Sequence, residues 1–520
     1  MTMPQRLPAT PLPLFNSANT RALEQAALAW HPQPSLMQRA GRACAQLAQA
    51  LAPHAQHMWV LCGPGNNGGD GLAAAAILAA QGRKVTLTWL GQRERCSSDT
   101  LVALQQAQNQ AIHWSDTPPA LQPHDLIVDA LLGLGLHSQA AANPRIAALL
   151  QHSYASPATV LAVDLPSGLQ ADTGLWQAGY APQTPHHSPS HQQRHTLSLL
   201  TLKPGLFTAD GRDAAGQIWF DDLGLGQLPI APPRPAPTAW LHHPAAPITA
   251  GLAARRHASH KGSFGDVLVI GGQGLQAGAA MQGAAILAAS AALHHAAGRA
   301  FLHLLDHGQL QQLPQTPEIM LRNQVTALAQ LPSSTVVCGC GGGSSVAALL
   351  PKVLEHSARL LLDADALNAI AADAMLRQRL KNRGAAGLPT VLTPHPLEAA
   401  RLLNSSVPAV QADRLTAAHT LANTLDCTVL LKGSGSIIAS PGEVPHINPT
   451  GNALLATGGT GDVLAGMVAA RWASMQNNVN SNAHHAACAG AYAHGAIADG
   501  WPAQRPLTAQ ALARTLARAC

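Results

Sequence analysis

The segment MWVLC (residues 58–62) is followed directly by GPGNNGGDG (residues 63–71) and then by an alanine-rich run from Leu72. A short apolar run bounded by glycine is typical of a buried strand, and the alanine-rich run favours a helix. Glycines lack a β-carbon, so the backbone amides of this loop can approach a phosphate at the start of the helix. The segment therefore predicts a strand, a phosphate-binding loop and a helix. A plain strand–helix turn is the alternative interpretation.

The same alternation of short apolar runs and long alanine-rich runs continues along the chain, which is typical of parallel sheets covered by helices. In the first half, strands are expected at residues 58–62, 85–90, 126–129, 159–164 and 195–202. In the second half, strands are expected at residues 266–270, 299–305, 335–338, 359–363, 390–392 and 428–431. The predicted fold class is α/β in both halves, with ligand-binding residues just after the carboxyl ends of the strands.

The length of 520 residues exceeds what one hydrophobic core usually supports, so two domains are expected. Residues 228–246 are rich in proline, which removes amide donors and fixes φ, so this stretch is expected to hold neither a helix nor an inner strand. We interpret it as a linker between domains at residues 1–227 and 247–520. A histidine- and proline-rich stretch at residues 182–194 is expected to be a surface loop of the first domain.

The composition excludes several classes of protein. Hydrophobic residues make up 47% and charged residues 11%, which excludes a disordered chain or a charged coiled coil. A net charge of +5 is too dilute for a nucleic-acid or membrane surface. The eight cysteines lack paired spacing, so neither a zinc site nor a disulfide framework is indicated. The N-terminus does not resemble a secretory signal and no run suits a membrane span, so we expect a cytoplasmic protein. A homo-oligomer is expected as well.

Polar residues follow three further strands of the first half. Asp129 ends one strand and precedes a loop with Gly133 and Gly135; VDLPSG (residues 163–168) ends the next, and Lys203 follows the third. Carboxylates, a hydroxyl and an ammonium would converge on one sheet edge, a cluster suited to binding a polar ligand and moving protons. A single Asp at such a place is usually a helix cap, which is the alternative for each taken alone.

Together these motifs resemble the YjeF N-terminal domain family, the NAD(P)H-hydrate epimerases, over roughly residues 15–225. The resemblance implies a Rossmann-like three-layer domain with catalytic roles for Asp164 and Lys203. It also implies that K⁺ is bound by Asn67, Asp129 and Ser167, whose oxygen atoms suit a hard cation. The substrate contacts that it implies are Asn66, Asn67, Gly68, Gly69, Asp70, Gly133, Gly135 and Asp164.

In the second half, GGTGDVLAG (residues 458–466) turns from glycines into an apolar helical pattern. Free amides at that helix start can bind an anion, and Asp462 can deprotonate a hydroxyl that attacks a phosphoryl group. A purely capping role for Asp462 is the alternative. KGSGS (residues 432–436) offers a lysine and bare backbone to nucleotide phosphates. TPHPLE (residues 393–398) presents His395, which taken alone would be a surface histidine.

The segments KGSFG (261–265), DADALN (363–368), TPHPLE, KGSGS and GGTGD resemble, in this order, the ADP/ATP-dependent NAD(P)H-hydrate dehydratases of the ribokinase-like superfamily. The resemblance covers about residues 245–515 and implies that Asp462 is catalytic. Nucleotide contacts are implied for Lys432, Gly433, Ser434, Gly435, Ser436 and Gly461. Hydrate contacts are implied for Ala280, Gly341, His395 and Asp462. Asp363 and Asp365 are not assigned catalytic roles, because a cap or a distant metal contact would explain them.

One loop departs from that family. Residues 339–343 are GCGGG, where the family typically has G-P-G-L-G. Because proline restricts φ and glycine does not, we expect this loop to be looser than in the family.

Both halves imply the same substrate, NAD(P)H hydrate, which exists as two epimers. The expected activity is epimerisation in the first domain and dehydration in the second, at the expense of ADP or ATP, with release of phosphate and AMP or ADP. Mg²⁺ would offset the charge of the nucleotide. The alternative is a ribokinase-like small-molecule kinase fused to a non-catalytic nucleotide-binding scaffold. A stable phosphorylated product would identify the kinase, whereas the presence of both Asp164 and Lys203 argues against the scaffold.

Overall fold

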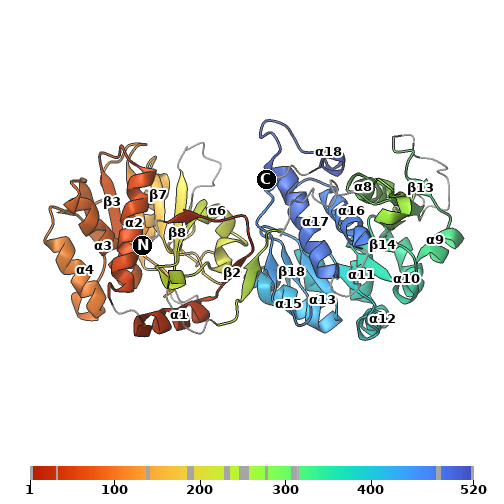
Figure 1. The fold of residues 1–520 in the computed structure, drawn as a ribbon, viewed down its shortest axis with the longest axis horizontal. Helices are drawn as coiled ribbons and strands as arrows, with labels where there is room; N and C mark the ends of the chain where they lie inside the picture. The colour runs from red at the N-terminus through yellow and green to blue at the C-terminus, as the bar shows by residue number, and fades with distance from the viewer. Residues whose placement is uncertain are drawn as a thin grey trace. The chain divides into compact units, whose positions relative to one another are not determined.

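The computed structural model describes residues 4–30, 33–135, 141–183, 193–227, 235–244, 257–275, 279–305, 313, 315–475 and 482–516. The chain divides into two compact units. The first consists of Met1–Ala9 with Pro13–Ala239, and the second of Thr10–Leu12 with Trp240–Cys520. Figure 1 shows the elements of both units.

The first unit is built on an eight-stranded sheet with the order β1-β9-β8-β7-β6-β3-β4-β5. Its strands are β1 (Gln5–Arg6), β3 (Met58–Cys62), β4 (Val85–Trp89), β5 (His113–Trp114), β6 (Leu126–Ala130), β7 (Thr159–Val163), β8 (Arg194–Leu199) and β9 (Gln217–Asp221). Every neighbouring pair is parallel except β1 with β9. The short strand β2 (Leu12–Leu14) crosses the boundary between the units near residue 12.

Helices cover both faces of this sheet. They are α1 (Ser17–Trp30), α2 (Leu36–Leu51), α3 (Asn66–Ala80), α4 (Ser98–Gln108), α5 (Pro144–Ala155) and α6 (Gly211–Ala215). Because side chains of a strand alternate between faces, Met58 and Val60 of β3 join the core under α2, α3 and α4, whereas Trp59 and Leu61 join the core under α5. Figure 1 shows α2, α3 and α4 side by side. The unit therefore has three layers.

The second unit is built on a sheet whose strands run in the order β13-β12-β11-β14-β15-β16-β17-β18-β19-β10. Their bounds are β10 (Ala239–Leu241), β11 (Asp266–Gly271), β12 (Arg299–Leu304), β13 (Met320–Leu321), β14 (Thr335–Cys338), β15 (Arg359–Leu362), β16 (Thr390–Leu392), β17 (Thr428–Leu431), β18 (Ile437–Ala439) and β19 (His446–Ile447). Strands β11 to β17 are parallel to one another wherever they pair, β18 is antiparallel to both of its neighbours, β17 and β19, and β10 is parallel to β19.

The helices of the second unit are α8 (Gln282–His294), α9 (Gln324–Gln330), α10 (Leu350–His356), α11 (Ala364–Ala372), α12 (Ala374–Ala385), α13 (Pro396–Leu403), α14 (Val407–Ala412), α15 (Arg414–Leu425), α16 (Thr460–Ser474), α17 (Asn482–Asp499) and α18 (Ala509–Arg514). One core joins α8, α16 and α17 to strand residues such as Val269 and Leu361. The alternate residues Leu360 and Leu362 are also fully buried, on the opposite face of the same strand. Among the described helices, none has the length and apolarity that crossing a membrane requires.

The α/β fold class is confirmed, and every expected strand is present, although β8 ends at Leu199, three residues before its predicted end. The strands that were not anticipated, apart from one in the predicted linker, are β1, β2, β5, β9, β13, β18 and β19. All of them except β9 have only two or three residues, too few for a recognisable apolar run.

Two interpretations need correction. The helix expected from Leu72 begins at Asn66, so the glycine-rich segment is its first two turns rather than a separate loop. Within the predicted linker, Ala239–Leu241 form β10, because six residues between Pro237 and Pro244 are free of proline and can pair with β19. Linker residues 228–234 and 245–246, and residues 184–192 of the predicted surface loop, lie outside the described residues.

Candidate functional site

The start of α3 lies at the carboxyl end of β3 and carries Asn66, Asn67, Gly68, Gly69 and Asp70. The glycines here permit close packing. A β-carbon on Gly63 would lie 1.7 Å from the carbonyl oxygen of Leu131, and one on Gly68 would lie 2.0 Å from the carbonyl oxygen of Gly63. None of the glycines between residues 63 and 71 has a positive φ. The first-turn amides of α3 are therefore held against the loop that follows β6, where they can meet an anion.

The three residues expected to bind K⁺ lie at this edge of the sheet. The Ser167 hydroxyl donates to Asp129 Oδ1 at 2.6 Å and the Ser167 amide donates to Oδ2 at 3.0 Å. The Leu132 amide donates to Ser167 Oγ at 2.8 Å, and Asn67 Nδ2 donates to the Leu132 carbonyl at 3.1 Å. Burial raises the pKa of Asp129, an effect that the hydrogen bonds from Ser167 oppose.

Asn67 Oδ1 is buried and has no hydrogen-bond partner among the described residues. An orphaned carbonyl oxygen beside a carboxylate and a hydroxyl fits a hard monovalent cation, because such ions prefer oxygen ligands. A β-carbon on Gly133 would lie 3.2 Å from Asn67 Cβ, so the loop after β6 packs directly on this set. Gly135 is exposed at the end of the described part of that loop.

Asp164 and Lys203 form a buried ion pair at the ends of β7 and β8. The Lys203 ammonium contacts Asp164 Oδ1 and donates to the Leu199 carbonyl at 2.8 Å, while the Leu199 amide donates to Asp164 Oδ1 at 3.1 Å. Lys203 is fully buried, and the Asp164 side chain is 12% exposed. Asp164 also has a φ of 68°, a left-handed conformation that costs free energy for a residue other than glycine and is typical of functional sites.

Two more carboxyl groups lie near this pair. Burial, and then the charges of Asp164 and Glu24, raise the pKa of Asp70 well above its usual value. Burial and Asp164 likewise raise the pKa of Glu24, on α1. Asp70 was expected at this site. Glu24 was not expected, because nothing in the sequence of α1 shows that the Glu24 side chain faces the carboxyl edge of the sheet. Several acids around one buried lysine make a site that can hold and move protons.

In the second unit, α16 begins in the glycine-rich segment 458–461. Its N-cap, Gly459, has a φ of 89°, which favours glycine, and Asp462 lies in the first turn. A β-carbon on Gly461 would lie 3.5 Å from Lys432 Nζ, so the ammonium lies next to the start of the helix. Burial, and then the charge of Asp363, raise the pKa of Asp462 to about 6. An ammonium, free amides and a carboxylate with this pKa suit phosphoryl transfer to a hydroxyl.

Lys432 is held between two carboxylates. Its Nζ donates to Asp363 Oδ1 at 2.8 Å and lies 4.0 Å from Glu398 Oε2. Burial opposes the charged ammonium, yet Asp363 and Glu398 raise the pKa of Lys432. Burial raises the pKa of Glu398 to about 6. Asp363, which was not assigned to the site, therefore belongs to it as a partner of Lys432, and Glu398 is a further member that the sequence analysis missed.

His395 is the N-cap of α13. Its Nδ1 accepts the amides of Leu397 at 3.1 Å and Glu398 at 3.3 Å, while the His395 amide donates to Glu398 Oε2 at 2.8 Å. The capping role expected for a surface histidine is therefore present. The His395 side chain is still 46% exposed, and its Nε2 lies 3.2 Å from Glu398 Oε1. Burial and the charge of Lys432 lower the pKa of His395, which keeps the ring neutral near pH 7.

The loop of residues 339–343 has left-handed φ values at three glycines, and its looseness relative to the family stays a prediction. Gly339, Gly341 and Gly343 have φ values of 122°, 57° and 54°, whereas Gly342 has a φ of −76° and Cys340 has no positive φ. The backbone therefore requires glycine at residues 339, 341 and 343, which are the three positions where the family pattern G-P-G-L-G also has glycine. A β-carbon on Gly341 would lie 2.4 Å from the carbonyl oxygen of Met281, which brings the segment with Ala280 against this loop.

Cys340 lies inside the same site. Its thiol is hydrogen-bonded to Asp462, an interaction that lowers the pKa of that carboxyl group, and lies 3.9 Å from Asp363 Oδ2. In the sequence, Cys340 is noticeable only as a departure from the family pattern, and nothing there indicates that it lies next to Asp462.

The KGSGS segment forms the turn between β17 and β18 and includes Gly433, Ser434, Gly435 and Ser436. Gly433 has a φ of 144°, and a β-carbon there would lie 2.6 Å from Arg414 Nη1. Arg414 Nη2 donates to the Lys432 carbonyl at 3.3 Å. Arg414, which no sequence pattern had singled out, supports the turn from behind.

The chain is similar to known proteins along almost its full length. A family model described as NAD(P)H-hydrate dehydratase matches residues 267–518, and one described as YjeF-related protein N-terminus matches residues 33–205. The Bifunctional NAD(P)H-hydrate repair enzyme Nnr of Escherichia coli is 36% identical over 89% of this chain and 84% of that protein. The protein of the same name from Coxiella burnetii is 34% identical over 94% of each chain.

The ADP-dependent (S)-NAD(P)H-hydrate dehydratase of Neisseria meningitidis is 40% identical over 47% of this chain and 80% of that protein. The two family models fall on the two α/β units of the fold, one on each unit. The chain therefore belongs to the family of bifunctional NAD(P)H-hydrate repair enzymes.

Proposed function

We propose that this chain repairs hydrated NADH and NADPH by interconverting the R and S epimers and dehydrating the S epimer to NAD(P)H. Family membership supports both activities. The observation that carries the proposal is that each unit has its own lysine–aspartate constellation at the carboxyl edge of its own sheet. These are Lys203 with Asp164, and Lys432 with Asp363 and Asp462.

In the first unit, Asp164 is proposed to move the proton. The hydrated ring carries its hydroxyl on a carbon next to the ring nitrogen. Asp164 would pass the hydroxyl proton to that nitrogen as the carbon–nitrogen bond opens to an aldehyde. It would return the proton to the oxygen when the nitrogen closes on the other face of the carbonyl. Lys203 holds the Asp164 carboxylate and stabilises its charge. Asn66 to Asp70, Gly133 and Gly135 are proposed to contact the nucleotide part of the substrate.

Asn67, Asp129 and Ser167 are proposed to bind K⁺, which the orphaned Asn67 oxygen supports. Bound K⁺ would supply a fixed positive charge at this sheet edge. The chain's own contribution is the network from Asp129 through Ser167 to Leu132, which fixes the loop after β6 next to α3.

In the second unit, Asp462 is proposed to be the general base. The hydroxyl of the hydrate attacks the terminal phosphoryl group of ADP or ATP, its proton passes to Asp462, and AMP or ADP leaves. The lone pair of the ring nitrogen then expels phosphate from the carbon that carried the hydroxyl. The next ring carbon gives up a proton to solvent, which restores the carbon–carbon double bond of NAD(P)H. Lys432 and the amides at the start of α16 stabilise the phosphoryl oxygens.

The proposed contacts divide between nucleotide and hydrate. Residues Lys432 to Ser436 and Gly461 bind the adenine nucleotide, and Ala280, Gly341, His395 and Asp462 contact the hydrate. Mg²⁺ would offset the phosphate charge when bound with the nucleotide, and no residue is assigned to it. The choice between ADP and ATP, a cytoplasmic location and a homo-oligomer remain predictions.

An assay of the purified full chain with the resolved epimers of NADH hydrate and either ADP or ATP tests this proposal. Both epimers should disappear, NADH should form, and free phosphate should equal the NADH formed. A stable phosphorylated product without NADH would instead identify the small-molecule kinase. Persistence of one epimer beyond its spontaneous conversion would identify the first unit as a non-catalytic scaffold.

A further inference from the structure

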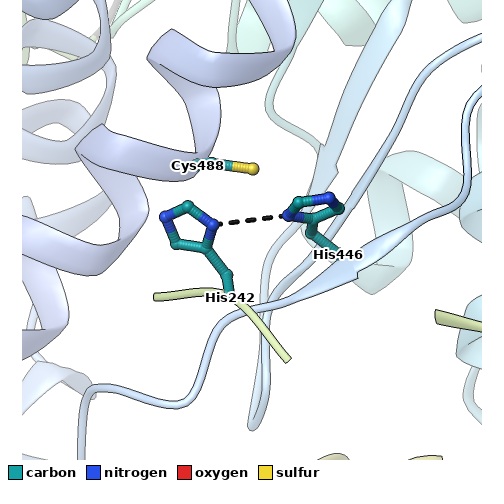
Figure 2. A group of neighbouring side chains, drawn as sticks. All are labelled: His242, His446 and Cys488. Atoms are coloured by element: carbon teal, nitrogen blue, oxygen red, sulfur yellow. Dashed lines mark hydrogen bonds between the residues drawn. The ribbon is translucent and has the colours of Figure 1, made fainter. Parts of the chain in front are cut away.

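Among residues that are assigned to neither proposed site, three potential metal ligands of the second unit converge from separate elements. His242 follows β10, His446 lies on β19, and Cys488 lies on α17. One ligand atom from each residue lies within 4.8 Å of the other two. Figure 2 shows the two imidazole rings facing each other with the thiol above the gap between them. The backbone fixes this arrangement, because the His242 amide donates to the Ile447 carbonyl at 2.9 Å, beside His446.

The spacing of the two rings fits one tetrahedral metal ion. His242 Nδ1 and His446 Nδ1 are 3.3 Å apart. Two nitrogens each about 2.0–2.1 Å from a tetrahedral Zn²⁺ are about 3.3 Å apart, and a thiolate about 2.3 Å from the ion is about 3.6 Å from each nitrogen. The rings therefore already have the required separation, and the thiol of Cys488, which lies within 4.8 Å of the ring nitrogens, needs a displacement of up to about 1.2 Å.

Packing alone is a poor explanation for His242. The residue is 8% exposed, and His242 Nε2 is buried without a hydrogen-bond partner among the described residues. Within the described residues, the His242 ring makes its hydrogen bond through Nδ1, to His446 Nδ1. A buried imidazole with a single hydrogen bond costs free energy that an apolar side chain would not. A polar residue kept at that cost indicates a role beyond filling space.

The surroundings of the two rings include a further histidine and a carboxylate. His484 packs edge to face on His446 at 4.8 Å and lies 3.4 Å from the carboxylate of Glu443. His446 is half-exposed, which leaves a path for an ion from solvent.

We propose that His242, His446 and Cys488 form a binding site for one divalent transition-metal ion of the zinc class. Two imidazoles and one thiolate are ligands of borderline softness that suit such an ion, with water as a fourth ligand. Binding releases the thiol proton to solvent, because the metal binds the thiolate. The ion would fasten β10 and β19 to α17. The ligands are 204 and 42 residues apart along the chain, which explains why cysteine spacing does not indicate a zinc site.

The site is distinct from the second thiol-containing group, Cys340 with Asp363 and Asp462. In that group Asp363 already accepts hydrogen bonds from Lys432 at 2.8 Å and Thr393 at 2.8 Å, and the group belongs to the proposed dehydratase site.

Co²⁺ titration of the full chain, stripped of metal with a chelator, tests the proposal. Co²⁺ bound to a thiolate gives a charge-transfer absorption in the near ultraviolet, which histidines alone do not give. We expect one equivalent of Co²⁺ to produce this absorption and one equivalent of Zn²⁺ to abolish it. Cys488→Ser should remove the absorption. It should also weaken Zn²⁺ binding by more than ~10- to 100-fold, which is the usual cost of losing a residue that only hydrogen-bonds to a metal ligand.

Two variants serve as matched controls. His243→Ala removes the neighbouring histidine, whose Nδ1 lies 3.4 Å from the Tyr492 hydroxyl, and should keep the absorption. Cys340→Ala removes the other candidate thiol and should keep it too. If Cys488→Ser does not fold, His446→Ala at the half-exposed position replaces it and should also lose the absorption. No absorption from the folded wild-type chain, its survival in Cys488→Ser or His446→Ala, or its loss in Cys340→Ala would overturn the proposal.

Discussion

The two glycine-rich helix starts of this chain look alike in sequence but differ in structure. In α3, Gly63 and Gly68 allow the helix to lie against backbone that a β-carbon would strike, and no residue of the segment has a positive φ. In α16, Gly459 adopts a left-handed φ of 89°, and Gly461 leaves space beside the Lys432 ammonium. Glycine thus serves packing at the first helix and access to a charged group at the second.

The lysines of the two sites differ in the same way. Lys203 is fully buried against Asp164, so its charge acts on carboxyl groups of the protein, first of all on Asp164. Lys432 is 19% exposed, next to a helix start with free amides. A closed pair suits proton movement within the substrate, whereas an open ammonium suits the oxygens of a transferring phosphoryl group. The two proposed activities therefore differ in how far their lysines are exposed, and substitutions at each site should affect one activity and spare the other.

The largest effect is expected from Asp462→Asn, which removes the proton acceptor without changing the side-chain volume. Dehydration should fall by about 10²- to 10⁴-fold, the usual contribution of a general base. Epimerisation and nucleotide binding should be nearly unchanged, as measured by epimer-resolved chromatography and by nucleotide titration. A variant that keeps more than about half of its dehydration rate would remove Asp462 from the mechanism.

Asp164→Asn or Lys203→Ala should slow epimer exchange while the S epimer is still dehydrated. One epimer should be consumed and the other should persist, so total NADH recovery falls by less than in Asp462→Asn. Because removing one partner of a buried ion pair can cost about 3–5 kcal/mol, the folded state of each variant is checked by circular dichroism. Loss of both epimers at the wild-type rate would show that this pair is not the epimerase site.

The packing role of the α3 glycines predicts a difference between neighbouring substitutions. Gly68→Ala places a β-carbon 2.0 Å from the Gly63 carbonyl oxygen, whereas a β-carbon on Gly65 meets nothing within 4 Å. Gly68→Ala should destabilise the first unit by about 1–3 kcal/mol or more, the usual cost of overpacking. Gly65→Ala should change stability by at most about 0.5 kcal/mol. Heat inactivation of epimerase activity measures both, and equal inactivation would contradict the packing account.

The smallest effect concerns pH. The pKa of Asp462 is raised to about 6, and the base must be ionised, so dehydration should decline as pH falls through about 6. The Cys340 thiol lowers that pKa, so Cys340→Ala should move the midpoint of the rate profile to higher pH, with little change in rate at pH 8. Glu398 titrates in the same range and should respond less to this substitution. An unchanged midpoint would show that Cys340 does not act on Asp462.

Sequence patterns predicted the parts of the molecule that depend on local order. The strands appear as apolar runs, and the residues that follow them meet at the sheet edge because parallel strands end on the same side. The start of α3 was misplaced, because glycine usually disfavours helix interiors and only the contact with the neighbouring backbone reveals why it is there.

The remaining site residues could not be predicted in this way. Glu24, Glu398 and Arg414 join their sites through tertiary contacts with residues far along the chain, and their own neighbours in the sequence carry no motif. The strand β10 was hidden by its flanking prolines, and with it the position of His242 beside His446.

The most direct test of two separate sites in one chain uses the two inactive variants together. Full-length Asp164→Asn and Asp462→Asn are mixed with ADP, or ATP, and both epimers of NADH hydrate. Each protein alone should leave hydrate behind, since one lacks epimer exchange and the other lacks dehydration. We predict that the mixture consumes both epimers and releases one phosphate per NADH formed. If both variants fold and the mixture still leaves one epimer unconverted beyond its spontaneous exchange, the division of the two activities between the two units is wrong.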